Sequence, residues 1–148
     1  QQGVKNMEIS TQNTVAVLGL RQKVVTDLDL AMAIEKGFPT STIDSVIKRI
    51  APKDPSFAYK IIPRATLARH KRDNRRLSLE QSDSVARLAR IWALANSVWK
   101  SDEAARRFLF EPHQLLGGKR PIDMAVRTAV GARMVEGILG RLEYGSAA

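Results

Sequence analysis

The feature that most constrains the fold is a stretch of helical periodicity from residue 78 to residue 99 that contains neither glycine nor proline. Ser78 followed by Gln81 is typical of a capping box, in which two side chains satisfy free N–H groups where a helix begins. Downstream, apolar side chains recur every three or four residues and form one wide stripe. This pattern predicts a central core helix, with both tryptophans packed in the core rather than forming a binding surface. The stripe consists of Val85, Leu88, Ala89, Trp92, Ala95, Val98 and Trp99.

Shorter helical patterns lie on both sides of this helix and are separated by glycine, proline and cap residues. The predicted fold class is therefore all-α, a multi-helix domain with an N-terminal and a C-terminal half. Residues 8–20 are rich in Thr and Val but lack a clean period, so we predict an extended or disordered arm over residues 1–20. The other helices are predicted to begin near Asp27, Thr40, Pro63, Ser101, Pro121 and Thr128.

The last predicted helix combines an apolar stripe with two glycines. Gly137 and Gly140 each lower helix propensity by about 1 kcal/mol relative to Ala. Such a loss suggests close approach by another backbone, either within the fold or from a partner. The residues of this helix that we expect to be buried are Val130, Met134, Val135, Ile138, Leu139 and Leu142.

Composition limits the class of protein. The chain has 148 residues, of which 44% are hydrophobic, enough for one compact domain or two small cooperating halves. It contains no cysteine, so disulfides and thiolate metal sites are excluded. No run of residues is long and apolar enough for a membrane span, and no signal-peptide pattern opens the chain. We expect a soluble, cytoplasmic protein that does not associate with membranes.

The net charge of +9 is concentrated in one segment. Residues 60–76 contain seven Lys and Arg side chains and a single Asp. Clustered cations favour a polyanionic partner, because binding to phosphates releases counterions. The alternative is an ordinary solvated basic face, and charge alone does not separate the two interpretations.

No catalytic motif is found in the sequence. Residues 117–120 (GGKR) resemble half of a phosphate-binding loop, but His113 stands where that motif needs Gly and Arg120 where it needs Ser or Thr. His70 and His113 lie in different segments with no carboxylate at the spacing of metal ligands. We therefore expect a binding protein with no catalytic residue, metal or cofactor.

Several segments resemble the Xre/MbcA/ParS antitoxins of the RES-Xre family. In the C-terminal part these are Leu116–Asp123 (LGGKRPID) and Arg141–Gly145 (RLEYG), with Thr128, Gly131, Val135 and Leu139 between them. Upstream, Pro63–Arg69 (PRATLAR), Leu77–Asp83 (LSLEQSD) and Arg87–Arg90 (RLAR) resemble the Xre-like half. The resemblance implies an Xre-like helix-turn-helix half over residues 21–77 and a toxin-binding domain over residues 78–148.

The function implied by this resemblance is that of an antitoxin in a type II toxin-antitoxin system. Its partner would be a RES-domain toxin that consumes NAD, as an NADase or an ADP-ribosyltransferase. We expect the C-terminal end to block the NAD pocket, with Arg141 and Tyr144 in contact. The alternative is that Leu142 and Tyr144 only pin the last helix to its own core. The predicted toxin-binding residues are Gly117, Gly118, Arg120, Gly140, Arg141, Glu143, Tyr144 and Gly145.

A second implied function is repression of the antitoxin's own operon. The helix near residues 63–72 would then act as a recognition helix on operator DNA, and palindromic operators favour a homodimer within a toxin-antitoxin hetero-oligomer. The preceding segment 51–60 is longer than the tight turn of a standard helix-turn-helix, so a version that does not bind DNA is the alternative. A stand-alone transcriptional regulator is the second function considered, and an enzyme of unknown type is the third. The predicted DNA-binding residues are Arg64, Thr66 and Arg69 for bases and Lys71, Arg72, Arg75 and Arg76 for phosphates.

Overall fold

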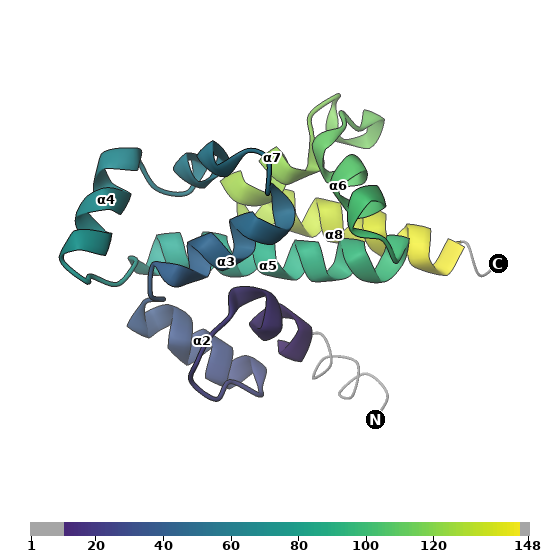
Figure 1. Ribbon diagram of the computed structural model, residues 1–148. Coiled ribbons are helices and arrows are strands. Elements are labelled where there is room, and N and C mark those ends of the chain that lie inside the picture. Colours follow the sequence, from purple (N-terminus) through teal and green to yellow (C-terminus); the bar gives the residue numbers. More distant parts are fainter. Residues whose placement is uncertain (1–10, 146–148) are drawn as a thin grey trace.

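The computed structural model describes residues 11–145, and this part of the chain is built from helices (Figure 1). None of the described helices is long and apolar enough to cross a membrane. After a helical segment at residues 11–18, the elements are α2 (Asp27–Lys36), α3 (Ser41–Ile50), the 3₁₀ helix η1 (Pro55–Lys60), α4 (Arg64–Arg72), α5 (Leu79–Trp99), α6 (Asp102–Phe110), the 3₁₀ helix η2 (Gln114–Leu116), α7 (Pro121–Arg127) and α8 (Ala129–Gly145). The predicted all-α fold is confirmed.

The axis of the molecule is α5, which contacts α2, α3, α6, α7 and α8 (Figure 1). The predicted capping box is present, since Ser78 Oγ accepts from Gln81 N at 3.1 Å and Gln81 Oε1 accepts from Ser78 N at 2.9 Å. Trp92 is buried as predicted, but Trp99 is 40% exposed, so its predicted core position was wrong. Trp99 is the last residue of the helix, and its ring lies 6.1 Å from that of Phe108.

The N-terminal segment differs from its prediction. Residues 11–18 form a helix, so the prediction of an extended arm was wrong there; residues 1–10 lie outside the described part. Val17 and Leu18 are buried in the core, and Ser45 Oγ donates to the Val17 carbonyl at 2.7 Å. Thr and Val are weak helix formers, but burial of an apolar face overrides propensity.

A tight turn joins α2 to α3 and is fixed against the start of α5. Gly37 has a φ of +95°, and a Cβ on it would lie 2.5 Å from the carbonyl oxygen of Leu77. Phe38 is buried, its N–H donates to Ser82 Oγ at 2.9 Å, and its carbonyl accepts from Leu77 N at 2.8 Å. The turn therefore needs glycine for both its dihedral angle and its close contact.

A second close backbone contact joins α7 to α8. Thr128 caps α8 as predicted, because its Oγ1 accepts from Gly131 N at 2.9 Å. A Cβ on Gly131 would overlap the carbonyl oxygen of Met124. A Cβ on Gly137 or Gly140 would meet nothing within 4 Å, so the predicted close approach within the fold was wrong at these two positions. Approach by a partner at either glycine stays a prediction.

The apolar residues of α8 divide into a buried and an exposed set. Val135, Ile138 and Leu139 are buried as predicted. Val130 is 56% exposed, Met134 43% and Leu142 38%, so their predicted burial was wrong. The helix packs on α7 and α5 through one face, and Val130 and Met134 lie on its outer face.

Candidate functional site

The cationic helix α4 lies at one end of the molecule, far from α6 and from the end of α8 (Figure 1). It begins after Pro63, whose φ of −57° suits the entry to a helix. Leu67 is its one buried residue. A helix anchored by one side chain leaves most of its surface to solvent.

The structure brings the predicted DNA-binding residues together on α4 and the loop that follows it. The Arg64 guanidinium stacks over the Tyr59 ring, 5.8 Å from its centroid. Arg69 Nη2 donates to Thr66 Oγ1 at 3.5 Å, one turn earlier. Arg64, Arg69 and Arg75 are all exposed, so these three cations remain accessible to a partner.

Two of the predicted phosphate contacts also hold the fold together. Lys71 Nζ pairs with Asp44 Oδ1 of α3 at 3.0 Å. Arg76 Nη1 donates to the Gly37 carbonyl at 2.9 Å and so closes the loop before α5 onto the α2–α3 turn. Arg72 pairs with the carboxylate of the next residue at 3.2 Å. Lys71 and Arg72 are exposed, and surface ion pairs of this kind are weak enough to exchange for phosphate.

The glycine turn between α6 and α7 is ordered by backbone bonds. His113 and Lys119 form an isolated antiparallel bridge, with His113 N donating to the Lys119 carbonyl at 3.0 Å. Gly117 and Gly118 have φ values of +64° and +81°, which glycine adopts without strain. Leu115, at the tip of the turn, is 62% exposed. Sequence reasoning missed Leu115 because nothing in its pattern shows that it lacks a neighbour.

Arg120, a predicted toxin contact, is engaged within the fold. Its Nε donates to Asp123 Oδ2 at 2.7 Å and its Nη2 to Asp123 Oδ1 at 3.0 Å, while its guanidinium stacks on Phe110. Lys60 Nζ, at the end of η1, pairs with Asp123 Oδ1 at 2.8 Å and links the two halves of the chain. The hydrogen bonds from Arg120, followed by the one from Lys60, hold the pKa of Asp123 below its usual value. The same bond to Asp123 raises the pKa of Arg120.

A basic hollow of about 640 Å³ opens beside this network. Four cations line it, Lys60, Lys119, Arg120 and Arg127, with Asp123 as the one acid. Gly118 also borders it, so this part of the predicted toxin-binding set faces a positively charged depression.

The other part of the predicted toxin-binding set lies at the end of α8. Residues 141–145 are all exposed, and Tyr144 is 74% exposed. Leu142 lines a hollow of about 320 Å³ together with Trp99, Phe108 and His113. Tyr144 therefore does not pin the helix to its own core, whereas Leu142 partly does. The two hollows share no lining residue, so the predicted set forms two separate surfaces.

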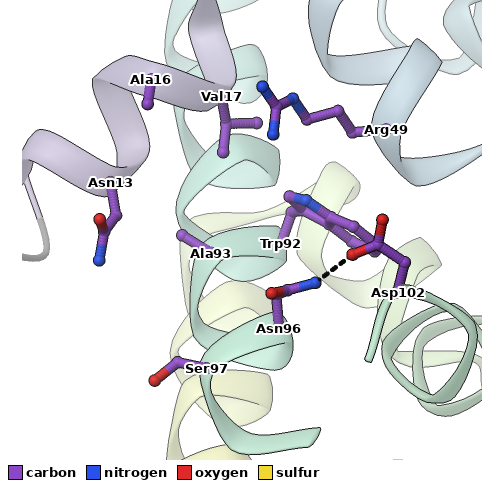
Figure 2. A pocket seen from close by; sticks show the side chains of 9 residues that line it. All are labelled: Asn13, Ala16, Val17, Arg49, Trp92, Ala93, Asn96, Ser97 and Asp102. Carbon is purple, nitrogen blue, oxygen red and sulfur yellow. Dashed lines mark hydrogen bonds between the residues drawn. The ribbon is translucent and has the colours of Figure 1, made fainter. Parts of the chain in front are cut away.

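A third hollow, of about 280 Å³, lies where residues 11–18 meet α3, α5 and α6 (Figure 2). Arg49, Asn96 and Asp102 point toward it, and Asn96 Nδ2 donates to Asp102 Oδ1. The ring of Trp92 forms part of its wall and stacks under Arg106, whose Nε donates to the Arg49 carbonyl at 2.9 Å. None of the predicted site residues lines this hollow.

Known proteins resemble both halves of the chain. The antitoxin Xre-like helix-turn-helix domain matches residues 29–90, and the antitoxin Xre/MbcA/ParS C-terminal toxin-binding domain matches residues 94–145. A protein of Yersinia enterocolitica named antitoxin Xre is 30% identical over 118 residues, 78% of this chain and 79% of its own length. The chain belongs to the Xre antitoxin family. Another antitoxin Xre, from Pseudomonas putida, is 27% identical over 123 residues, 83% of this chain and 76% of its own length.

Within this Xre antitoxin, the junction between the two matched regions falls inside α5. Residues from both halves belong to a single hydrophobic cluster around that helix. The two halves therefore share one core. The division between residues 77 and 78 stays a prediction about function rather than a break in packing.

A short turn of the kind found in a helix-turn-helix lies between α2 and α3. A helix-turn-helix joins its two helices by a short turn that often contains glycine. Residues 37–40 form such a turn between α2 and α3, whereas residues 51–63, with η1 among them, separate α3 from α4. This geometry favours α3 as the second helix of the motif, with the cations of α4 beside it through the Lys71–Asp44 pair.

Histidine serves the fold in the toxin-binding domain. His113 Nδ1 accepts from Leu115 N at 3.1 Å, and its ring packs edge-on against Phe108 at 6.0 Å. Across residues 11–145, no three His, Asp or Glu side chains are placed to hold a metal ion.

Proposed function

We propose that this Xre antitoxin neutralises a RES-domain toxin, an enzyme that consumes NAD by degrading it or by ADP-ribosylating a protein. In this proposal the chain acts by binding, without catalysis of its own, in the cytoplasm. The last turn of α8 lies across the toxin's NAD pocket, with Arg141 and Tyr144 in direct contact. The turn at Gly117, Gly118 and Arg120 contacts the rim of the toxin.

The observation that supports occlusion is the exposure of the end of α8. All five residues from 141 to 145 are exposed, and Tyr144 is the most exposed large side chain among the described apolar and aromatic residues. An aromatic ring left in water is unfavourable in the free protein but suits a pocket shaped for the flat rings of NAD. Arg141 lies one turn earlier on the same side, where it would meet an acidic group at the pocket mouth.

The test of occlusion is deletion of residues 143–148. The toxin encoded beside this chain is mixed with full-length or truncated antitoxin, and NAD consumption is followed. We expect the full chain to suppress NAD loss and the truncated chain to leave it undiminished. Undiminished inhibition by the truncated chain would refute occlusion by this end.

Point variants show which side chains carry the effect. Tyr144→Ala and Arg141→Ala should each weaken inhibition, because each removes one contact but leaves the backbone of α8 in place. Met32→Ala is the matched control, since Met32 is an exposed apolar residue on α2 in the other half. Equal inhibition by Tyr144→Ala and Met32→Ala would exclude Tyr144 from the toxin contact.

A second activity, binding to operator DNA, is supported by the charge of α4. Six exposed Lys and Arg residues follow one another on this helix and in the loop after it, at Arg64, Arg69, Lys71, Arg72, Arg75 and Arg76. We propose that the last four contact phosphates, that Arg64 and Arg69 face the bases together with Thr66, and that a homodimer places two such surfaces on a palindromic operator. The antitoxin represses its own operon by this activity.

A promoter-binding assay tests this second activity and separates the antitoxin from a stand-alone regulator. DNA from upstream of the operon should bind with an affinity that falls as salt rises. Absence of a shift, with and without toxin, would exclude operator binding. A stand-alone regulator would bind the same DNA yet fail to retain the toxin in a pull-down.

A further inference from the structure

The outer face of α8 carries an unusual row of residues that the fold does not use. Val130, Met134, Gly137 and Arg141 recur with spacings of four, three and four, which places them on one narrow side of a helix. All four are exposed. We call these four residues and their neighbour Arg133 the α8 stripe. The same spacing continues to Tyr144, so the stripe runs directly into the proposed occluding end.

The α8 stripe is held in a fixed position by the opposite face of the same helix. Val135, Ile138 and Leu139 are buried against the core, and Thr128 and Gly131 fix the start of the helix through a cap and a close backbone contact. The stripe is therefore a shaped surface and not a loose segment. Exposed Val130 and Met134 on a rigid backbone, with two arginines beside them, fit a docking site.

Gly137 gives the α8 stripe a flat centre. A Cβ there would meet nothing within 4 Å, so packing within the fold does not require glycine at this position. Glycine in a helix interior lowers stability by about 1 kcal/mol relative to Ala. Its absent side chain allows another backbone to approach closely between Met134 and Arg141, as small residues do at close helix contacts.

Charge identifies the kind of surface that fits. Arg133 and Arg141 are exposed, and neither pairs with a carboxylate of residues 11–145 in the structure. The two acids of α8 lie off the stripe by helical spacing, and Glu136 pairs with Arg90 of α5. A second copy of this chain would bring arginine against arginine. An acidic partner surface avoids that repulsion.

We propose that the α8 stripe is the docking surface for the toxin, and that it receives an acidic, apolar helix or loop of the toxin with its backbone close to Gly137. This inference rests on the proposed function and assigns toxin binding and toxin inhibition to different parts of α8. The stripe supplies affinity and orientation, and the end of α8 supplies inhibition. The stripe lies within residues 94–145, the part of the chain that matches the toxin-binding domain.

The experiment measures affinity and inhibition separately with the full chain and the toxin encoded beside it. Gly137→Leu places a large side chain at the flat centre, and Arg133→Glu reverses one charge. Ala68→Leu is the matched control, a change to the same side chain at an exposed helix position on α4. We expect Gly137→Leu and Arg133→Glu to weaken toxin binding by about tenfold or more, and Ala68→Leu by less than about twofold.

The outcomes distinguish this proposal from occlusion by the end of α8. Deletion of residues 143–148 should abolish inhibition yet leave much of the toxin affinity, whereas Gly137→Leu should lose affinity first. Toxin binding by Gly137→Leu at the strength of the unmodified chain would overturn the stripe as docking surface and leave occlusion standing. Sedimentation of the antitoxin alone provides a further check. If Gly137→Leu turns a dimer into a monomer, the occupant is a second copy and the proposal is wrong.

Folding of the variants is verified by thermal unfolding. The space above Gly137 is open, so Gly137→Leu should unfold at or above the temperature of the unmodified chain. Arg133→Glu changes only an exposed side chain and provides a second route to the same result.

Discussion

The helices α4 and α8 both present a surface to solvent, but they are held to the core in different ways. α4 has nine residues and one buried side chain, that of Leu67. α8 has seventeen residues and buries an entire face, which includes Val135, Ile138 and Leu139. The outer surface of α4 is cationic, whereas that of α8 is mostly apolar.

This difference matches the two kinds of partner we propose. Attraction between charges acts over about 8–10 Å at physiological salt, so a lightly anchored helix can still contact phosphates. Packing between proteins requires apolar atoms within about 4–4.5 Å of each other, so the helix that presents them needs a fixed backbone. The cationic surface thus lies on the weakly anchored helix α4, and the mostly apolar surface lies on the strongly anchored helix α8.

Truncating the buried side chains that hold α8 and α4 to the core should produce the largest changes in the free energy of unfolding. We expect Leu139→Ala to lower the free energy of unfolding by about 3–4 kcal/mol, because the residue is fully buried between helices. Leu67→Ala should lower it by about 2 kcal/mol, since α4 can settle onto the gap. Urea unfolding followed by circular dichroism measures both, with Leu28→Ala on the surface of α2 as control. A larger loss for Leu67→Ala would reverse our assignment of the two helices.

The two glycines of α8 should respond in opposite directions. Gly131→Ala brings a methyl group against the Met124 carbonyl and should destabilise the protein by about 2 kcal/mol. Gly137→Ala, with open space around it, should stabilise it by about 0.5–1 kcal/mol. Calorimetric unfolding of both variants tests the comparison. A stability loss at Gly137 would mean that the fold itself needs this glycine.

The stability that the ion pairs of Asp123 contribute should depend on pH. Because the folded protein lowers the pKa of Asp123, its contribution is present above the unfolded value, near 3.8, and is lost as pH falls through the lower folded value. We expect Asp123→Asn to lower stability at pH 7 by about 1–2 kcal/mol, a range that allows for partial exposure of the three side chains. Thermal unfolding at pH 7 and near pH 3 should show the variant approaching the unmodified chain in acid. An identical difference at both pH values would remove Asp123 from this role.

Neutralising single cations of α4 should have the smallest effect on stability. Arg69→Gln and Arg72→Gln should each change the free energy of unfolding by less than about 0.5 kcal/mol, because both side chains are exposed. Arg72→Gln, which removes a proposed phosphate contact, should reduce the slope of log affinity for operator DNA against log salt by about 0.9, and Arg69→Gln should weaken binding chiefly to the cognate operator. Fluorescence anisotropy at several salt concentrations measures the slope. Unchanged slopes would place the DNA contact elsewhere, and α3 would be the next helix to test.

Much of the fold follows from local patterns in the sequence. The Ser78–Gln81 capping box and the apolar period of α5 are properties of one segment, and they predict its start and its buried side. The spacing of apolar residues shows which side of a helix is buried, but it does not show how wide the buried side is. That width depends on how many helices pack against it, which is why Val130 and Met134 were predicted to be buried. The helix at residues 11–18 forms because the core covers it, a contact that its weak propensity does not reveal.

Less of the candidate site than of the fold could be predicted from the sequence. The sequence shows that the cations of α4 lie in one segment, and it predicts that the end of α8 protrudes. It missed the pairing of Lys60 with Asp123, because residues far apart in the chain meet only after folding. Gly131 and Gly137 look alike in the sequence, and only the position of Met124 separates a packing glycine from an exposed one.

Competition with NAD tests most directly whether the end of α8 occupies the toxin's NAD pocket. The affinity of the toxin for the full chain, and for the chain without residues 143–148, is measured in increasing concentrations of a non-cleavable NAD analogue. We predict that the apparent dissociation constant of the full chain rises with the analogue and levels off near that of the truncated chain, while that of the truncated chain stays constant. A full chain whose affinity does not respond to the analogue would contradict occlusion.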